Sequence, residues 1–244
     1  MHQENLKYQV EEKVMDGFLV YDPSNTQRRP AVIIAHAWRG QDDFAREKAH
    51  ELAQLGYVAF AADLYGDGKE ASSDEEAAQL MRPLFINRKR LRQRIVAAYK
   101  TLKECPQVDS RKIGAIGFCF GGLTVIELLR SGVDIRGAVS FHGVLGDTMG
   151  ESKAHLEPLA KSIPGALLIL HGHDDPLVSA EDIAKIQTEL TEAKVDWQMN
   201  IYGHTAHAFT NPLVNDANNG MVYNSKVSQR AWWSMRHFFE EVFN

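Results

Sequence analysis

The sequence predicts an α/β fold in which a mostly parallel, twisted sheet is covered by helices on both faces. One observation is that apolar, β-branched runs such as residues 30–38 (PAVIIAHAW) are continuous, which is typical of strands buried on both sides. The other is that such runs alternate with segments of helical periodicity over most of the chain. With 244 residues, of which 44% are hydrophobic, we expect one globular domain that spans residues 1–244.

The individual elements follow from apolar patterning and from capping residues. The expected strands cover residues 17–23, 30–38, 57–66, 112–118, 135–143, 165–175 and 195–203. The expected helices cover residues 42–56, 72–104, 121–132, 179–194 and 225–243. Acidic residues or serine begin several of these helices and glycine ends some of them. Pro83 is expected to break the segment 72–104 into two helical pieces, because proline interrupts helical hydrogen bonding.

Charge and composition exclude several classes of partner. The formal net charge is −5, which argues against nucleic acid and against anionic membrane surfaces. The basic run at residues 87–94 is interpreted as a solvated helix face. The N-terminal residues lack the apolar core of a signal peptide, and no apolar run approaches the length that crosses a bilayer. With Cys105 and Cys119 as the two cysteines, we expect a monomeric cytoplasmic protein with reduced thiols.

Candidate functional residues follow the predicted strands, because ligand sites in parallel sheets lie beyond the carboxyl ends of the strands. This criterion selects His36–Arg39, Asp63–Gly66, Cys119, His142, His171–Asp175 and His204–His207. His36 and His142 each end a buried strand, so each either lines the cleft or is a structural histidine.

Cys119 has the most specific surroundings of these candidates. It lies in GFCFG, a Gly-x-Cys-x-Gly frame between a strand and a helix, and the same frame with serine is the nucleophile elbow. Gly117 and Gly121 permit a tight turn, and the N-terminus of the following helix favours the thiolate. The amide of Phe120 is then placed to donate to an oxyanion. Cys105 has no such frame and is interpreted as structural.

A nucleophile needs a base and a residue that orients the base. Asp174 and Asp175 follow the strand at 165–175, and His204 and His207 follow the strand at 195–203. The order nucleophile, acid, histidine is that of hydrolases with a nucleophile elbow. The residues alone do not decide between the two aspartates or between the two histidines.

These motifs together resemble the dienelactone hydrolase family, cysteine-dependent members of the α/β-hydrolase superfamily. The resemblance extends over nearly the whole chain and implies an α/β-hydrolase fold. It is carried by HAWRG, DLYGDG, GFCFGG, HGHDDPLV and HAF, taken in this order. It implies that Asp175, before the proline, is the catalytic acid and that His207, in HAF, is the catalytic histidine. It also implies that the second oxyanion donor is the backbone amide of Trp38.

The chain departs from dienelactone hydrolase proper at two positions. Ala37 stands where the family type carries a glutamate that controls the cysteine, and Asn211 stands where it carries an arginine for a substrate carboxylate. Arg82 lies near the region of the family's other arginine. We therefore expect neutral esters to be accepted at least as well as anionic lactones.

The resulting hypothesis is a hydrolase of carboxylic esters or lactones that acts through a Cys119–His207–Asp175 triad and an acyl-cysteine intermediate. We expect a small-molecule substrate, no cofactor and no metal. Met81, Phe85 and His142 are the candidate substrate-binding residues. Two alternatives remain open: a metal-dependent hydrolase that uses His171 and His173, in a near match to a zinc motif, and a non-catalytic binding protein of the same fold.

Overall fold

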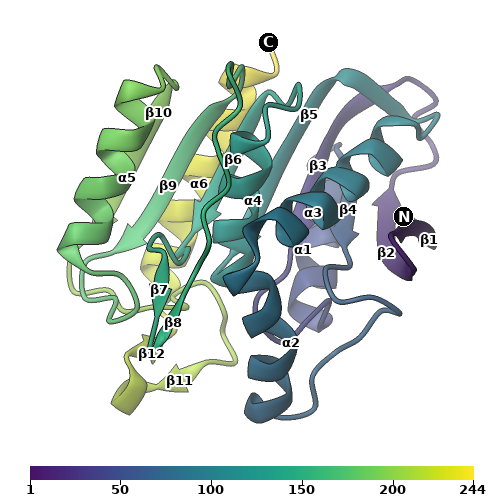
Figure 1. Ribbon diagram of the computed structural model, residues 1–244. Helices are drawn as coiled ribbons and strands as arrows, with labels where there is room; N and C mark the ends of the chain where they lie inside the picture. Colours follow the sequence, from purple (N-terminus) through teal and green to yellow (C-terminus); the bar gives the residue numbers. More distant parts are fainter.

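An eight-stranded sheet forms the centre of the computed structural model, which describes residues 1–244 (Figure 1). The strands are β1 (His2–Val10), β2 (Lys13–Tyr21), β3 (Arg29–Ala35), β4 (Val58–Ala62), β5 (Val108–Phe118), β6 (Gly137–Phe141), β9 (Ala166–Gly172) and β10 (Trp197–Tyr202). Their order in the sheet is β1-β2-β4-β3-β5-β6-β9-β10. β1 pairs antiparallel with β2, and β2 with β4, whereas all other neighbours are parallel. The predicted fold class is confirmed.

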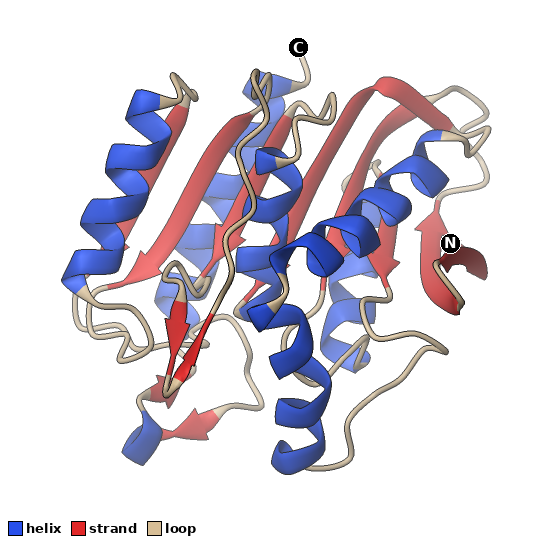
Figure 2. Ribbon diagram, in the orientation of Figure 1, coloured by secondary structure: helices blue, strands red, loops and turns tan.

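Helices cover both faces of this sheet (Figure 2). They are α1 (Asp43–Gln54), α2 (Asp74–Ile86), α3 (Arg88–Lys103), α4 (Phe120–Arg130), α5 (Ala180–Glu192) and α6 (Ser225–Val242). α1 and α6 pack on one face, and α3, α4 and α5 contribute to the apolar layer on the other. None of the helices combines the length and the apolarity needed to cross a membrane.

The continuous apolar strands supply both layers of the core alternately. Along β3, Ile33 packs into the layer under α3 and α4, whereas Ile34 packs into the layer under α1 and α6. Successive side chains of a strand point to opposite faces, so a strand buried on both sides must be apolar at every position. The same alternation places Phe118, the last residue of β5, on the α1/α6 side. Cys119 follows Phe118 directly, between β5 and α4.

Two elements differ from the sequence prediction. The N-terminal segment, which was not predicted to be a strand, forms β1 at the edge of the sheet; its polar residues escaped an apolar criterion because only Tyr8 and Val10 are buried. Pro83 lies inside α2 and does not break it, and the break between α2 and α3 falls at Asn87. The Asn87 side chain accepts a hydrogen bond from the amide of Arg90 and thereby caps α3.

The basic run at residues 87–94 is not a uniformly solvated face, and this interpretation was wrong. Arg88 and Arg94 are buried. Arg92 donates to buried Glu127 on α4 at 2.6 Å, and Arg88 lies 3.6 Å from the same carboxylate. Burial of these guanidinium groups is tolerated because each has a carboxylate or carbonyl partner.

Smaller elements lie beyond the carboxyl end of the sheet, at the bottom of Figure 1. They are β7 (Thr148–Met149), β8 (Ser152–Lys153), β11 (Asn215–Asp216), η1 (Ala217–Asn219) and β12 (Met221–Val222). β7 pairs with β8, and β11 pairs with β12, as two short antiparallel ribbons. The loops that carry the candidate residues lie at this edge.

Candidate active site

Cys119 occupies a strained turn between β5 and α4. Its φ is 55° and its ψ is −115°, a backbone conformation that residues with a side chain rarely adopt. A Cβ at Gly117 would collide with the carbonyl of Gly121, and one at Gly121 would collide with the carbonyl of Ala35. The two glycines of the frame are therefore required by close approach of the backbone. Cys119 itself is partly exposed.

Two backbone amides near this turn have no hydrogen-bond partner in the protein. The Phe120 amide is in the first turn of α4, where helices leave their N–H groups unpaired. The Trp38 amide is also unpaired, although it lies in a loop after β3. Because α4 begins against the carbonyls of Ala35 and His36, the loop that carries Trp38 lies next to the Cys119 turn. The two amides can donate to one oxyanion there.

His207 and Asp175 form a buried pair. Asp175 Oδ2 lies 2.7 Å from His207 Nδ1, and both side chains are almost fully excluded from solvent. Asp175 Oδ1 accepts from the amide of Leu177 at 2.9 Å, which fixes the carboxylate. With Nδ1 facing the carboxylate, Nε2 is the free nitrogen of the ring; it is buried and has no other partner.

The charge state of His207 depends on its neighbours. Burial alone would lower its pKa, but the negative charge of the Cys119 sulfur and the hydrogen bond to Asp175 outweigh burial and raise the pKa of His207 to about 10. The raised pKa favours the protonated ring of His207. An imidazolium beside a thiolate is the charge distribution that a cysteine nucleophile needs.

The main chain of His207 is held by the short ribbon of β11 and β12. Its amide donates to the carbonyl of Gly220 at 2.9 Å, and its carbonyl accepts from Val222 at 3.0 Å. Ala208, with a φ of 56°, turns the chain away after the histidine. The β11–β12 ribbon was not predicted from the sequence, because two-residue strands carry no apolar pattern.

Asp174 and His204, the other candidates for the acid and the base, are placed differently from Asp175 and His207. Asp174 and His204 are exposed, and neither forms a side-chain hydrogen bond within the protein. The amide of Asp174 donates to the carbonyl of Thr205 at 3.0 Å, so Asp174 contacts the neighbouring loop through its backbone and not through its carboxylate. The structure brings together Asp175 and His207 rather than their neighbours.

His142 lies against His207 and is buried. The two ring centroids are 5.1 Å apart in an edge-on arrangement, and His142 Nε2 forms a 2.7 Å hydrogen bond with the hydroxyl of Thr210. Burial, together with the charge of His207, holds the pKa of His142 well below its usual range. His142 is therefore a neutral ring that packs on the base.

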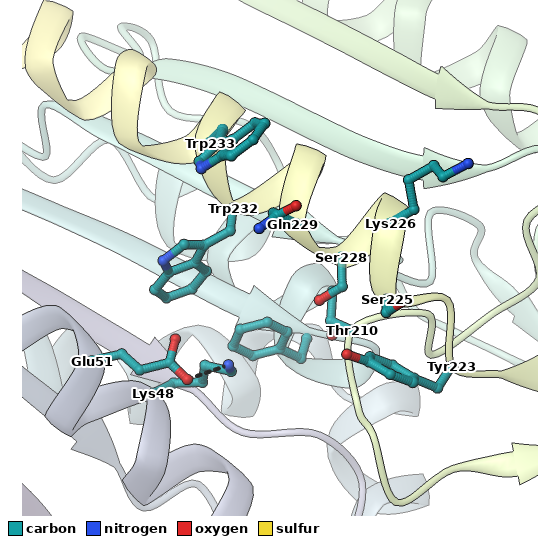
Figure 3. Close-up of a pocket in the computed structure, with 11 residues that line it drawn as sticks. Lys48, Glu51, Thr210, Tyr223, Ser225, Lys226, Ser228, Gln229, Trp232 and Trp233 are labelled. Atoms are coloured by element: carbon teal, nitrogen blue, oxygen red, sulfur yellow. Dashed lines mark hydrogen bonds and ion pairs between the residues drawn. The ribbon is translucent and has the colours of Figure 1, made fainter.

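Met81 and Phe85 on α2 line a cavity of about 260 Å³ together with Met149 and Ser152 of the β7–β8 ribbon, and neither Cys119 nor the His207–Asp175 pair lines it. Arg82 and Glu151 also line it. A larger groove of about 620 Å³ lies between α1, α6 and the segment that precedes α6 (Figure 3). Trp232 faces that groove, but neither Cys119 nor the His207–Asp175 pair lines it, so it is separate from the site described above.

His171 and His173, the residues of the metal-dependent alternative, diverge in the structure. His171 is buried at the end of β9 and burial lowers its pKa, whereas His173 is exposed. No group of three or more His, Cys, Asp or Glu side chains is arranged to hold a metal ion.

The order of the three residues along the chain, first cysteine, then aspartate, then histidine, each after a strand of a parallel sheet, is the order of the α/β-hydrolases, and the fold belongs to that class. A model of the dienelactone hydrolase family matches residues 15–243. The chain belongs to this family and is a carboxylic ester hydrolase of the dienelactone hydrolase type.

Three similar proteins illustrate this relationship. A crystal structure described as a dienelactone hydrolase-like promiscuous phosphotriesterase from metagenomic libraries is 33% identical, covers 100% of this chain and 99% of that chain, and has a TM-score of 0.91. Protein usf of Aquifex pyrophilus is 30% identical over 220 residues, 87% of this chain and 88% of the relative. A "Probable 2-oxo-3-(5-oxofuran-2-ylidene)propanoate lactonase" of Bradyrhizobium sp is 27% identical over 190 residues, 77% of this chain and 76% of the relative.

Proposed function

We propose that the protein hydrolyses carboxylic esters or lactones through a Cys119–His207–Asp175 triad and an acyl-cysteine intermediate. The observation that carries the proposal is the buried 2.7 Å hydrogen bond between His207 and Asp175, which leaves the other ring nitrogen free while Cys119 raises the pKa of the ring. A base oriented by a carboxylate and coupled to a thiol is the arrangement that activates a cysteine nucleophile.

In the acylation half of this mechanism, the Cys119 thiolate attacks the carbonyl carbon and a C–S bond forms. The carbonyl electron pair moves onto the oxygen, which accepts hydrogen bonds from the amides of Trp38 and Phe120. The tetrahedral intermediate collapses, the C–O bond to the alcohol breaks, and His207 gives its proton to the leaving oxygen. In a lactone, the leaving alcohol stays attached to the acyl chain.

In the deacylation half, His207 is neutral and accepts a proton from water as the water attacks the thioester carbonyl. The second tetrahedral intermediate uses the same two amides. Its collapse breaks the C–S bond, releases the carboxylic acid and regenerates the thiolate–imidazolium pair. Asp175 keeps the ring oriented and stabilises its positive charge in both halves, without itself accepting the proton.

Neutral substrates fit the surroundings of this site. Asn211, where the family type has an arginine, is half-buried and uncharged. Arg82 is exposed and lines a cavity that also contains Glu151. Met81 and Phe85 line the same cavity as Arg82, which neither Cys119 nor the His207–Asp175 pair lines. We expect neutral short-chain esters to be hydrolysed at least as well as lactones that carry a carboxylate.

Trapping the acyl-enzyme tests this proposal. Rapid acid quench of a reaction with a p-nitrophenyl ester, followed by peptide mass spectrometry, should find the acyl group on the peptide that contains Cys119, and hydroxylamine should remove it. The same reaction after treatment with a chelator should retain its rate. An acyl group on a different residue, or turnover lost to the chelator and restored by zinc, would overturn the mechanism.

A second activity, hydrolysis of phosphotriesters, is favoured by the likeness in structure to the promiscuous phosphotriesterase over the whole chain. The thiolate would attack phosphorus, an S–P bond would form and the P–O bond to the aryl group would break, with the charge on the phosphoryl oxygen held by the same amides. Water activated by His207 would then attack phosphorus, break the S–P bond, release the dialkyl phosphate and regenerate the thiolate. Release of p-nitrophenol from paraoxon tests this activity. If release is no faster than in a Cys119→Ala control, the protein does not have this activity.

A further inference from the structure

The loop that carries Trp38 is held by two side chains that the mechanism above does not use. His36 Nδ1 lies 2.6 Å from the carbonyl oxygen of Ala37, and the hydroxyl of Tyr65 donates to the carbonyl oxygen of Trp38 at 2.7 Å. The first carbonyl belongs to the peptide group that precedes the Trp38 Cα atom, and the second to the peptide group that follows it. Both side chains are buried, His36 at 1% exposure and Tyr65 at 2%.

The proton on His36 can be assigned from its second partner. The amide of Leu64 donates to His36 Nε2 at 3.2 Å, so Nε2 is an acceptor and carries no proton. In a neutral ring the proton is therefore on Nδ1, which donates it to the carbonyl of Ala37. Burial lowers the pKa of His36, which keeps the ring in this neutral form.

Leu64 is itself fixed by its surroundings. It lies in the turn after β4, where the buried Asp63 carboxylate accepts hydrogen bonds from the amides of Tyr65 and Gly66, both at 2.8 Å. The guanidinium of buried Arg94 donates to the carbonyl of Leu64. The turn after β4 is therefore a rigid support for His36 and Tyr65, whose ring centroids are 4.7 Å apart.

We propose that His36 is a positioning residue for the oxyanion hole, with Tyr65 as a second anchor of the same loop. The proposal rests on the proposed function, in which the Trp38 amide is an oxyanion donor. In a trans peptide the C=O and the N–H point in opposite directions, so a hydrogen bond that fixes the carbonyl of Ala37 also fixes the direction of the Trp38 N–H. The Trp38 N–H has no hydrogen-bond partner in the protein, so in this fixed direction it is available to an oxyanion.

The size of the effect follows from the number of bonds that hold the peptide. The amide of Gly40 also donates to the carbonyl of Ala37, at 3.3 Å, so loss of His36 displaces the peptide without releasing it completely. Complete loss of an oxyanion donor costs about 10²- to 10³-fold in kcat. We expect displacement to cost about 10- to 100-fold.

Two substitutions of His36 separate its two hydrogen bonds. His36→Asn places an amide N–H near the position of Nδ1 and can keep the bond to Ala37. His36→Gln places an amide oxygen near the position of Nε2 and can keep the bond from Leu64, but it loses the bond to Ala37. We expect His36→Gln to lower kcat by about 10- to 100-fold with little change in KM, and His36→Asn to restore most of this loss.

Two further measurements separate positioning from a general structural role. An aldehyde inhibitor adds to the nucleophile to form a tetrahedral oxyanion, so its inhibition constant should rise in His36→Gln by the same factor by which kcat/KM falls. Alkylation of Cys119 by iodoacetamide forms no oxyanion, so its rate should stay within about twofold of the unsubstituted protein. Alkylation that slows in parallel with hydrolysis would overturn the proposal, since the damage would then include the nucleophile.

Tyr65→Phe keeps the test decisive if His36→Gln does not fold. It should show the same pattern with a smaller loss, about 3- to 10-fold in kcat. An unchanged kcat and an unchanged aldehyde inhibition constant in Tyr65→Phe, with His36→Gln unchanged or unfolded, would refute the proposal. Cys119→Ala, run alongside, identifies a different failure: if it retains turnover, then the proposed function is wrong, whatever His36 does.

Discussion

Both cysteines of this chain are partly exposed, yet their surroundings favour opposite chemical behaviour. Cys119 sits at the carboxyl end of a buried strand, with a φ of 55°, and its charge raises the pKa of His207. Cys105 follows the last turn of α3, its Sγ lies 3.5 Å from the carbonyl of Thr101, and burial raises its pKa to about 11. Exposure therefore does not distinguish the proposed nucleophile from the other thiol. The backbone conformation and the neighbouring charge do.

Removal of each thiol is the strongest test of this contrast. Cys119→Ala should lower kcat/KM for a p-nitrophenyl ester by roughly 10⁴-fold or more, because loss of the nucleophile disables the whole triad. Cys105→Ala, the matched control, should stay within about twofold, since its thiol only packs at a helix end. Near-normal turnover in Cys119→Ala on every ester tested would show that Cys119 is not the nucleophile.

The orienting carboxylate should have the next largest effect. Asp175→Asn should lower kcat by about 10² to 10⁴-fold, because it removes the charge that holds the imidazolium in place. Asp174→Asn, one residue earlier and exposed, is the matched control and should change kcat by less than about twofold. Steady-state kinetics of the two variants measure the difference. Equal losses in both would contradict the assignment of the acid to Asp175.

Selective alkylation sharpens the contrast between the thiols without any substitution. At pH 7.5 iodoacetamide should modify Cys119 at least about 100-fold faster than Cys105, because the raised pKa of Cys105 leaves it almost wholly protonated. Peptide mapping against time measures both rates in one sample, and residual activity should fall in step with modification of Cys119. Full activity after complete modification of Cys119 would be incompatible with its role as nucleophile.

The pH profile gives the smallest and most specific effect. A thiolate–imidazolium pair loses activity at high pH when His207 loses its proton, and the charge of Cys119 and the hydrogen bond to Asp175 raise that pKa to about 10. Activity should therefore persist into alkaline solution. In Asp175→Asn the imidazolium loses a stabilising charge, so the basic limb of kcat/KM should move to lower pH by about one unit or more. A basic limb that does not move would separate Asp175 from the protonation of His207.

Much of the sheet was predictable because its strands are buried on both faces. Residues 30–35 are apolar at every position, and they make up all of β3 except Arg29. β1 was not predictable in this way, since an edge strand with two buried side chains carries too little apolar signal. Pro83 suggested a break, but the buried face of α2, which includes Met81 and Phe85, continues across it.

The candidate site could be predicted as far as it depends on position along the chain. Cys119, Asp175 and His207 each follow a strand, and parallel strands bring their carboxyl ends to one edge. The bond between His36 and the amide of Leu64 joins two loops that are 28 residues apart. Neither residue carries a pattern that indicates its partner. The same reason explains the basic run: the burial of Arg94 depends on the turn after β4, which the run itself does not reveal.

The attachment of His207 has a consequence for how the enzyme fails on heating. Cys119 ends a strand in the middle of the sheet, whereas the backbone of His207 is tied to a ribbon of two-residue strands in a segment that exposes Leu213 and other side chains to water. Segments with few buried contacts open at a lower free energy than the core that carries them. The β11–β12 ribbon should therefore open, reversibly, and loosen the backbone of His207 at temperatures where the sheet is still intact. Turnover would then be lost several degrees below the temperature at which the far-ultraviolet circular dichroism changes, and it would return on cooling. Loss of activity on heating would therefore precede unfolding of the sheet.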